Sequence, residues 1–153
     1  MSDKKVLVVF YSRGGNTRVV AEEFRKKFKA DLEEIVDTRN RKGFLGFILS
    51  GRDASQNRLA VIKPTIYNPS DYDLVIIGSP IWASRVSTPV RTYIEENKAR
   101  FKKVALFCTA LGDVKDTTWQ DIEALCGIKS EFTLGFSRKA MKENTYIGSI
   151  EKL

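Results

Sequence analysis

The chain has 153 residues, of which 42% are hydrophobic and 29% charged, and its formal net charge is +7. Domains commonly have ~100–150 residues, so we expect a single domain over residues 1–153. The sequence contains no histidine, which excludes Ser-His-Asp and Cys-His catalysis and indicates that any difficult chemistry comes from a cofactor.

The positive charge is scattered rather than gathered in one segment. Basic residues often stand beside acidic ones, as in Glu22–Lys27. No RNA-binding signature, helix-turn-helix pattern or zinc knuckle is present. We therefore favour a basic solvated surface, with no nucleic acid as partner, over a nucleic-acid-binding face.

The two cysteines indicate a reducing compartment. Cys108 and Cys126 stand in apolar surroundings at no metal-ligand spacing, so we predict buried, reduced thiols and no metal site. No run approaches the ~20 apolar residues of a membrane span, and the run Val6–Tyr11 is too short for a signal-peptide core. We expect a soluble cytoplasmic protein.

The first predicted unit is a strand, a loop and a helix. Residues Lys5–Tyr11 form a continuous apolar run, typical of a strand buried on both faces. After the loop, Val20, Phe24 and Phe28 recur every four residues and predict an amphipathic helix over 16–29.

The next stretch is less regular. Residues 31–36 mix acidic and apolar side chains and predict a short strand near an edge of the sheet. Within residues 39–64, the segment Phe44–Leu49 predicts one or two helical turns. We expect Gly51 to end these turns and residues 53–57 to resume the helix. We expect Phe44–Leu49 to pack on the sheet; if exposed, it would overhang a ligand or form a homodimer contact.

The second half of the chain again alternates strands and helices. Apolar runs predict strands at 73–79, 103–108 and 131–136. This alternation predicts a three-layer, doubly wound α/β domain with a parallel sheet and helices on both faces.

Helix starts are predicted from capping signals. Ser87-Thr88-Pro89 places a hydroxyl at the cap and proline at the first helical position. Thr117–Gln120 resembles a capping box, and it precedes an apolar stripe of Trp119, Ile122 and Leu125. The last ~17 residues have room only for a short terminal helix.

Ligands of such sheets bind beyond the carboxyl ends of the strands. Three loops leave strong strands at this position: 12–17, 79–84 and 109–113. The first suits a phosphate, because its two glycines allow close backbone approach, its polar side chains add donors and the next helix offers its positive N-terminus. The pattern is neither the P-loop nor the dinucleotide fingerprint. The alternative is a tight turn with an ordinary N-cap.

Three segments resemble the flavodoxin family. Tyr11–Thr17 is similar to its phosphate loop, Asp73–Trp82 to its third strand and first flavin-flanking loop, and Val104–Gly112 to its fourth strand and second flanking loop. The resemblance covers essentially the whole chain in the same order. It implies a flavodoxin-like fold with a five-stranded parallel sheet of order 2-1-3-4-5, and non-covalent flavin mononucleotide (FMN) as cofactor.

The resemblance also implies the cofactor-binding residues and leaves the chemistry to the flavin, with no catalytic side chain. They are Ser12, Arg13, Gly14, Gly15, Asn16 and Thr17 for the phosphate, Pro80, Ile81, Trp82 and Ala83 for the isoalloxazine, and Thr109, Ala110, Leu111 and Gly112 for its other edge. Trp82 is expected to stack on the ring; the alternative is a core aromatic beneath the loop.

Four departures from the family pattern bear on function. Gly14 stands where the family usually has a hydroxyl residue, so one phosphate donor is lost. Arg13 either compensates for this loss by its charge or points to solvent. Ala83 stands where many flavodoxins have glycine, so a positive φ there would cost roughly 1 kcal/mol. The second flanking loop lacks an aromatic, which leaves one face of the ring open or covered only by Leu111. The +7 charge contrasts with acidic carriers.

These departures favour electron transfer or NAD(P)H-dependent reduction of a quinone- or flavin-type acceptor through bound FMN. The donor would be NAD(P)H or a redox protein, and the positive charge suits an acidic partner. The alternatives are a non-enzymatic one-electron carrier between redox proteins and an FMN-binding regulatory module.

Overall fold

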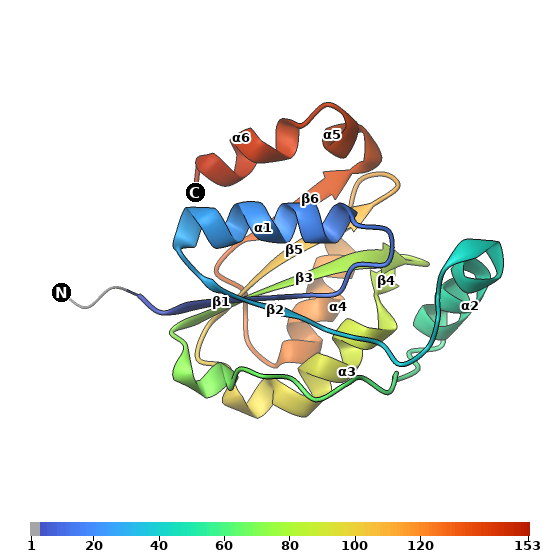
Figure 1. Cartoon of the computed structure of the whole chain (residues 1–153), viewed down its shortest axis with the longest axis horizontal. Coiled ribbons are helices and arrows are strands. Elements are labelled where there is room, and N and C mark those ends of the chain that lie inside the picture. Colours follow the sequence, from blue (N-terminus) through green and yellow to red (C-terminus); the bar gives the residue numbers. More distant parts are fainter. Residues whose placement is uncertain (1–3) are drawn as a thin grey trace.

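A parallel sheet of order β2-β1-β3-β5-β6 forms the middle layer (Figure 1). The computed structural model describes residues 4–153. The parallel strands are β1 (Val6–Phe10), β2 (Asp31–Glu34), β3 (Leu74–Trp82), β5 (Val104–Ala110) and β6 (Thr133–Ser137). The predicted fold class and strand order are confirmed. A further strand, β4 (Arg85–Val86), pairs antiparallel with the end of β3; two residues are too few to leave an alternating pattern in sequence.

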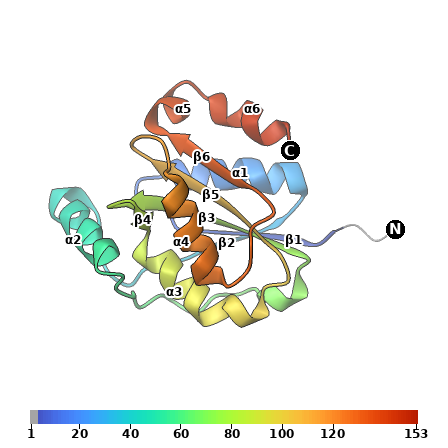
Figure 2. The same ribbon diagram turned by 180° about the vertical axis from the view of Figure 1, so that it is seen from behind.

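Helices cover both faces of this sheet (Figures 1 and 2). The bounds are α1 (Asn16–Phe28), α3 (Thr88–Asn97), α4 (Asp116–Cys126), α5 (Arg138–Lys142) and α6 (Thr145–Glu151), with short 3-10 turns at Pro69–Asp71 and Lys98–Arg100. The helices α1 and α6 lie on one face, and α3 and α4 on the other. Within residues 4–153, no helix is both long and apolar enough to cross a membrane.

The remaining helix, α2 (Gly43–Ser55), covers neither face and lies beside β4, beyond the carboxyl ends of the strands (Figure 1). Two predictions were wrong here. Gly51 does not end a helix, because an interior glycine costs only about 1 kcal/mol of helix stability and does not clash. Phe44–Leu49 does not pack on the sheet: Phe44 and Leu45 are 79% and 70% exposed.

The helix start predicted at Ser87-Thr88-Pro89 is confirmed, whereas the capping box predicted at Thr117–Gln120 was wrong. Ser87 is the N-cap of α3 but makes no capping hydrogen bond; its Oγ lies 2.8 Å from Oγ of Ser79. No capping box starts α4, which begins at Asp116. The hydroxyl of Thr118, one residue after the predicted cap Thr117, donates to the Ser84 carbonyl at 2.9 Å. At Ser87, the contact with Ser79 thus engages the hydroxyl that the local pattern assigned to the cap.

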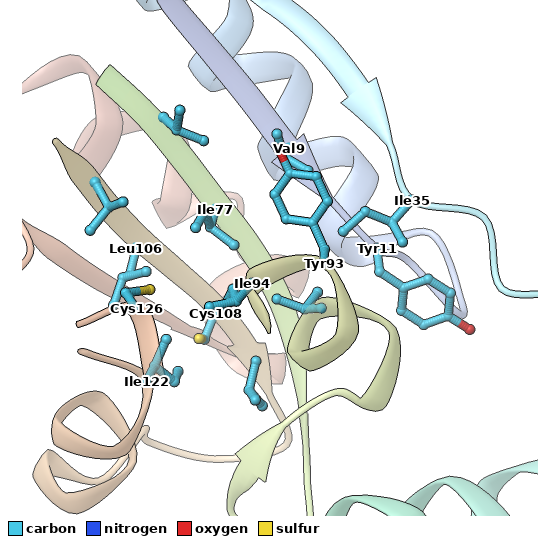
Figure 3. Close-up of a cluster of buried hydrophobic side chains, with 14 of the residues drawn as sticks. Val9, Tyr11, Ile35, Ile77, Tyr93, Ile94, Leu106, Cys108, Ile122 and Cys126 are labelled. Carbon is cyan, nitrogen blue, oxygen red and sulfur yellow. The ribbon is translucent and has the colours of Figure 1, made fainter. Parts of the chain in front are cut away.

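One half of the core lies between the sheet and α3 and α4 (Figure 3). Tyr93 and Ile94 from α3 and Ile122 from α4 pack against the strands there. Both cysteines are free and buried in this cluster, as predicted. Burial, with a smaller contribution from Glu123, raises the pKa of the Cys126 thiol to about 12.

The other half of the core places α1. Gly78 of β3 pairs with Phe107 of β5, and the Phe107 ring occupies the space that a side chain at Gly78 would fill. Phe24 of α1 stacks on this ring with centroids 4.8 Å apart. The missing side chain at Gly78 therefore lets α1 sit close over β3 and β5.

We predict that Gly78→Ala destabilises the protein by about 1–3 kcal/mol, because the new Cβ overlaps the Phe107 ring in a packed core. Gly148→Ala in α6 is the control. No atom lies within 4 Å of its added Cβ, and alanine favours the helix by about 0.5–1 kcal/mol. Urea unfolding followed by circular dichroism measures both; a Gly78→Ala midpoint at or above wild type would contradict the packing argument.

Candidate functional site

The three predicted loops meet beyond the carboxyl ends of β1, β3 and β5. The register pairs Phe10 with Gly78 and Pro80 with Thr109, so the loops leave the sheet at one level. The Thr17 and Thr109 hydroxyl oxygens, both buried, lie 2.8 Å apart and join the first loop to the third. Between the loops is a cavity of about 660 Å³, within the ~300–1,000 Å³ of typical small-molecule sites.

Most of the predicted site residues line this cavity. They are Arg13, Gly14, Asn16, Thr17, Pro80, Ile81, Trp82, Ala83, Thr109, Ala110 and Leu111. Ser12, Gly15 and Gly112 are not among the lining residues. Ser12 and Gly15 shape the turn instead, because Oγ of Ser12 accepts a hydrogen bond of 3.0 Å from the Gly15 N–H.

The first loop has the features of an anion site. Gly15 has φ of 106°, which suits glycine, and no side chain caps the start of α1. The N–H groups of the first helical turn have no acceptor within the helix, and Asn16 and Thr17 of that turn line the cavity. No atom lies within 4 Å of the Cβ position at Gly14, so the loop backbone there faces open space. These residues fit a phosphate group.

Trp82 has two roles. Its side chain is only 7% exposed and meets Tyr11 edge to face, with centroids 5.6 Å apart. It also lines the cavity. The residue is thus packed in the core beneath the loop and available at the cavity wall, and its stacking on a bound ring stays a prediction.

The turn after Trp82 holds two non-glycine residues in the left-handed region. Ala83 has φ of 50° and Ser84 has φ of 63°, as in the two-residue turns that join β-hairpins. The backbone cost expected for a positive φ at Ala83 is therefore present in this conformation. The hydrogen bond from Thr118 to the Ser84 carbonyl helps to hold the turn.

Sequence reasoning assigned no site residue to the wall of the cavity that α2 and α5 supply. Its residues are Phe47, Ile48, Gly51 and Arg52 from α2, and Arg138 and Met141 from α5. The exposed apolar run in α2 matches the alternative that it overhangs a ligand site. Nothing in the pattern around Arg138 and Met141 pointed to the cavity.

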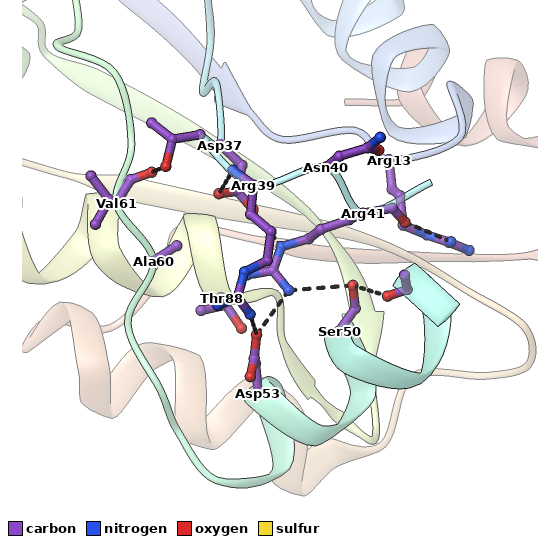
Figure 4. Close-up of polar contacts among 12 residues, drawn as sticks. Arg13, Asp37, Arg39, Asn40, Arg41, Ser50, Asp53, Ala60, Val61 and Thr88 are labelled. Carbon is purple, nitrogen blue, oxygen red and sulfur yellow. Dashed lines mark hydrogen bonds and ion pairs between the residues drawn. The ribbon is translucent and has the colours of Figure 1, made fainter. Parts of the chain in front are cut away.

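A buried ion-pair network holds α2 in place (Figure 4). Arg41, 4% exposed, donates to the carboxylate of Asp37 and, at 3.0 Å, to that of Asp53 in α2. Arg39 donates to the same Asp53 oxygen at 2.9 Å. Burial lowers the pKa of Arg41, but the hydrogen bonds to the carboxylates of Asp37 and Asp53 outweigh this effect. The pKa of Arg41 is therefore held above its usual value. The guanidinium also lies 5.2 Å above the Trp82 ring.

Arg13 connects the first loop to the same network. Its guanidinium donates to the Arg41 carbonyl at 3.3 Å and lies 5.5 Å above the Phe47 ring. Arg13 therefore does not simply point to solvent: it joins the first loop to α2 and lines the cavity. Gly46 brings α2 close, since a Cβ there would overlap the Arg41 carbonyl.

The chain is similar to a known protein family. A family model described as flavodoxin matches residues 5–132. Among curated proteins, no sequence matches this chain.

Solved structures with the same fold include three flavoproteins. A flavoprotein in complex with FMN from Lactobacillus acidophilus NCFM superposes with a TM-score of 0.76 at 22% identity, covering 92% of this chain and 97% of that one. A flavodoxin, WrbA-like protein from Agrobacterium tumefaciens superposes with a TM-score of 0.56 at 13% identity, covering 97% of this chain and 94% of that one. A flavodoxin from the domain Archaea superposes with a TM-score of 0.54 at 15% identity, covering 97% of this chain and 96% of that one.

We predict that Arg41→Met destabilises the protein by about 3–5 kcal/mol, because it removes the cation paired with the buried Asp37 carboxylate and one of the cations paired with Asp53. Arg39→Met is the control: its side chain is half-exposed and pairs with the same Asp53 oxygen, so its loss costs at most about 1 kcal/mol. Chemical unfolding of both variants measures the difference. Equal losses would show that Arg41 does not anchor α2.

Proposed function

Because the chain belongs to the flavodoxin family, we propose that it is an FMN-binding redox protein that uses NAD(P)H to reduce a small quinone- or flavin-type acceptor. The observation that carries this proposal is the convergence of an uncapped helix N-terminus, the Trp82 ring and a cavity of about 660 Å³. When bound, FMN supplies two-electron chemistry, in which a hydride from NAD(P)H and one proton from solvent convert a quinone to a quinol.

In this proposal the first loop binds the phosphate. Backbone N–H groups at the start of α1 and the side chains of Asn16 and Thr17 act as donors, and the helix dipole adds attraction. The hydroxyl contact between Thr17 and Thr109 sets the distance between the phosphate loop and the second flanking loop. Because position 14 is a glycine, the loop lacks the hydroxyl donor usual in the family, but its backbone donors remain.

The flanking loops would orient the isoalloxazine. The two loops start side by side, since Pro80 of β3 pairs with Thr109 of β5, and Pro80–Ala83 and Thr109–Leu111 line the same cavity. Leu111 is 72% exposed, and an exposed aliphatic side chain is a weak cover for a flavin face. Such an accessible face suits contact with a nicotinamide or a quinone, and the charge of +7 suits a phosphorylated donor.

Turnover tests the reductase function. We predict that protein reconstituted with FMN oxidises NADPH or NADH in steady state when benzoquinone is added, measured by nicotinamide absorbance, with free FMN at equal concentration as control. No turnover by a well-loaded sample would reject the reductase and leave the one-electron carrier. Failure to take up FMN at all would reject both.

The phosphate contact can be tested by charge. We predict that Asn16→Asp, which puts a carboxylate of nearly equal size at the start of α1, weakens FMN binding roughly tenfold or more, a free-energy change of about 1.4 kcal/mol. Riboflavin, which lacks the phosphate, serves as the matched ligand and should lose nothing. Flavin fluorescence titration measures both, and an equal loss for the two flavins would place the phosphate elsewhere.

A further inference from the structure

One wall of the cavity is not accounted for by the three loops assigned to FMN. It comes from α2 and α5, outside the phosphate loop and both flanking loops. Its apolar part comprises Phe47, Ile48 and Met141, and Leu111 lines the same cavity. Phe47 and Ile48 are 51% and 48% exposed, and apolar side chains gathered along a cavity wall are typical of small-molecule sites.

This wall is also cationic. Arg52 and Arg138 line the cavity, and no acidic residue does. Arg138 has no acidic side chain within ion-pair distance anywhere in residues 4–153. Arg52 has one distant partner, Oδ1 of Asp53 at 3.7 Å, and is half-exposed, so this pair is weak. Arg13 differs, because the Arg41 carbonyl and the Phe47 ring engage it.

The network around Arg41 gives this wall a fixed position. Asp53, which lies next to Arg52, is held by Arg41 and Arg39 at 3.0 and 2.9 Å. Phe47 is held by the guanidinium of Arg13. The apolar and cationic groups of α2 are thus presented to the cavity by a helix anchored through buried ion pairs.

We propose that the α2–α5 wall is the acceptor subsite and selects planar aromatic acceptors that carry an anionic substituent, such as sulfonated or carboxylated quinones. This rests on the proposed function. The aromatic ring packs against Phe47, Ile48 and Leu111, and Arg52 and Arg138 bind the anion by charge-assisted hydrogen bonds. An anionic acceptor complements the charge of this wall. A purely apolar molecule bound there would cover Arg52 and Arg138 without giving either of them a partner.

The chain offers a matched pair of variants. Arg52 and Arg58 both lie 3.7 Å from Oδ1 of Asp53 and are 47% and 52% exposed. Arg58 lines a different cavity, beside Asp37 and Thr38. Arg52→Met and Arg58→Met therefore remove the same charge from the same carboxylate, and only the first removes it from the proposed subsite.

The experiment measures binding to the oxidised, FMN-loaded protein by calorimetry, with flavin absorbance as a second signal. The probes are anthraquinone sulfonate and a neutral hydroxymethyl anthraquinone. We expect Arg52→Met to weaken sulfonate binding roughly tenfold and to leave the neutral probe unchanged. Arg58→Met should change neither, and Phe47→Ala should weaken both.

Three outcomes would overturn the subsite. These are no preference for the sulfonate, equal effects of Arg52→Met and Arg58→Met, and release of FMN by the probe, seen as free-flavin fluorescence. The reductase assay with neutral benzoquinone separates this from the proposed function. Turnover without discrimination between the probes rejects the subsite alone, whereas the expected binding pattern without any turnover rejects the reductase alone.

Discussion

The contact between Phe107 and Gly78 is the constraint on which the site depends. The ring lies over the glycine of the neighbouring strand, and Phe24 stacks on it at 4.8 Å. Helix α1 is therefore fixed over β3 and β5, and its N-terminus arrives at their carboxyl ends. This position of α1 brings the hydroxyl of Thr17 into contact with that of Thr109 at the cavity. Close packing on one face of the sheet thus sets the geometry of the phosphate loop.

A second constraint of a different kind places α2. This helix exposes much of its apolar surface, so hydrophobic burial alone does not fix it. The buried guanidinium of Arg41 joins Asp53 of α2 to Asp37, and also lies over Trp82. Removing one partner of such a network leaves a buried charge uncompensated. The network therefore defines where α2 stands rather than merely adding stability.

The two constraints hold two different parts of the cavity in place. The first part consists of the loops at the ends of β1, β3 and β5, which the strand order of the sheet brings together. The wall from α2 and α5 lies outside these loops and contributes apolar and cationic groups. In the proposed function, the first part binds the cofactor and the second meets the acceptor. Cofactor class and acceptor preference would then depend on separate segments of the chain.

The sequence by itself determined the fold class, the strand order through family resemblance, and most residues of the three loops. These features follow from local patterns: continuous apolar runs for buried strands, a four-residue repeat in α1, and glycines at the turn. Only the tertiary structure decided the position of α2, the role of Arg13 and the wall around Arg52. Those depend on partners far apart in sequence, such as Arg13 and Arg41, 28 residues apart, and no local pattern encodes such contacts.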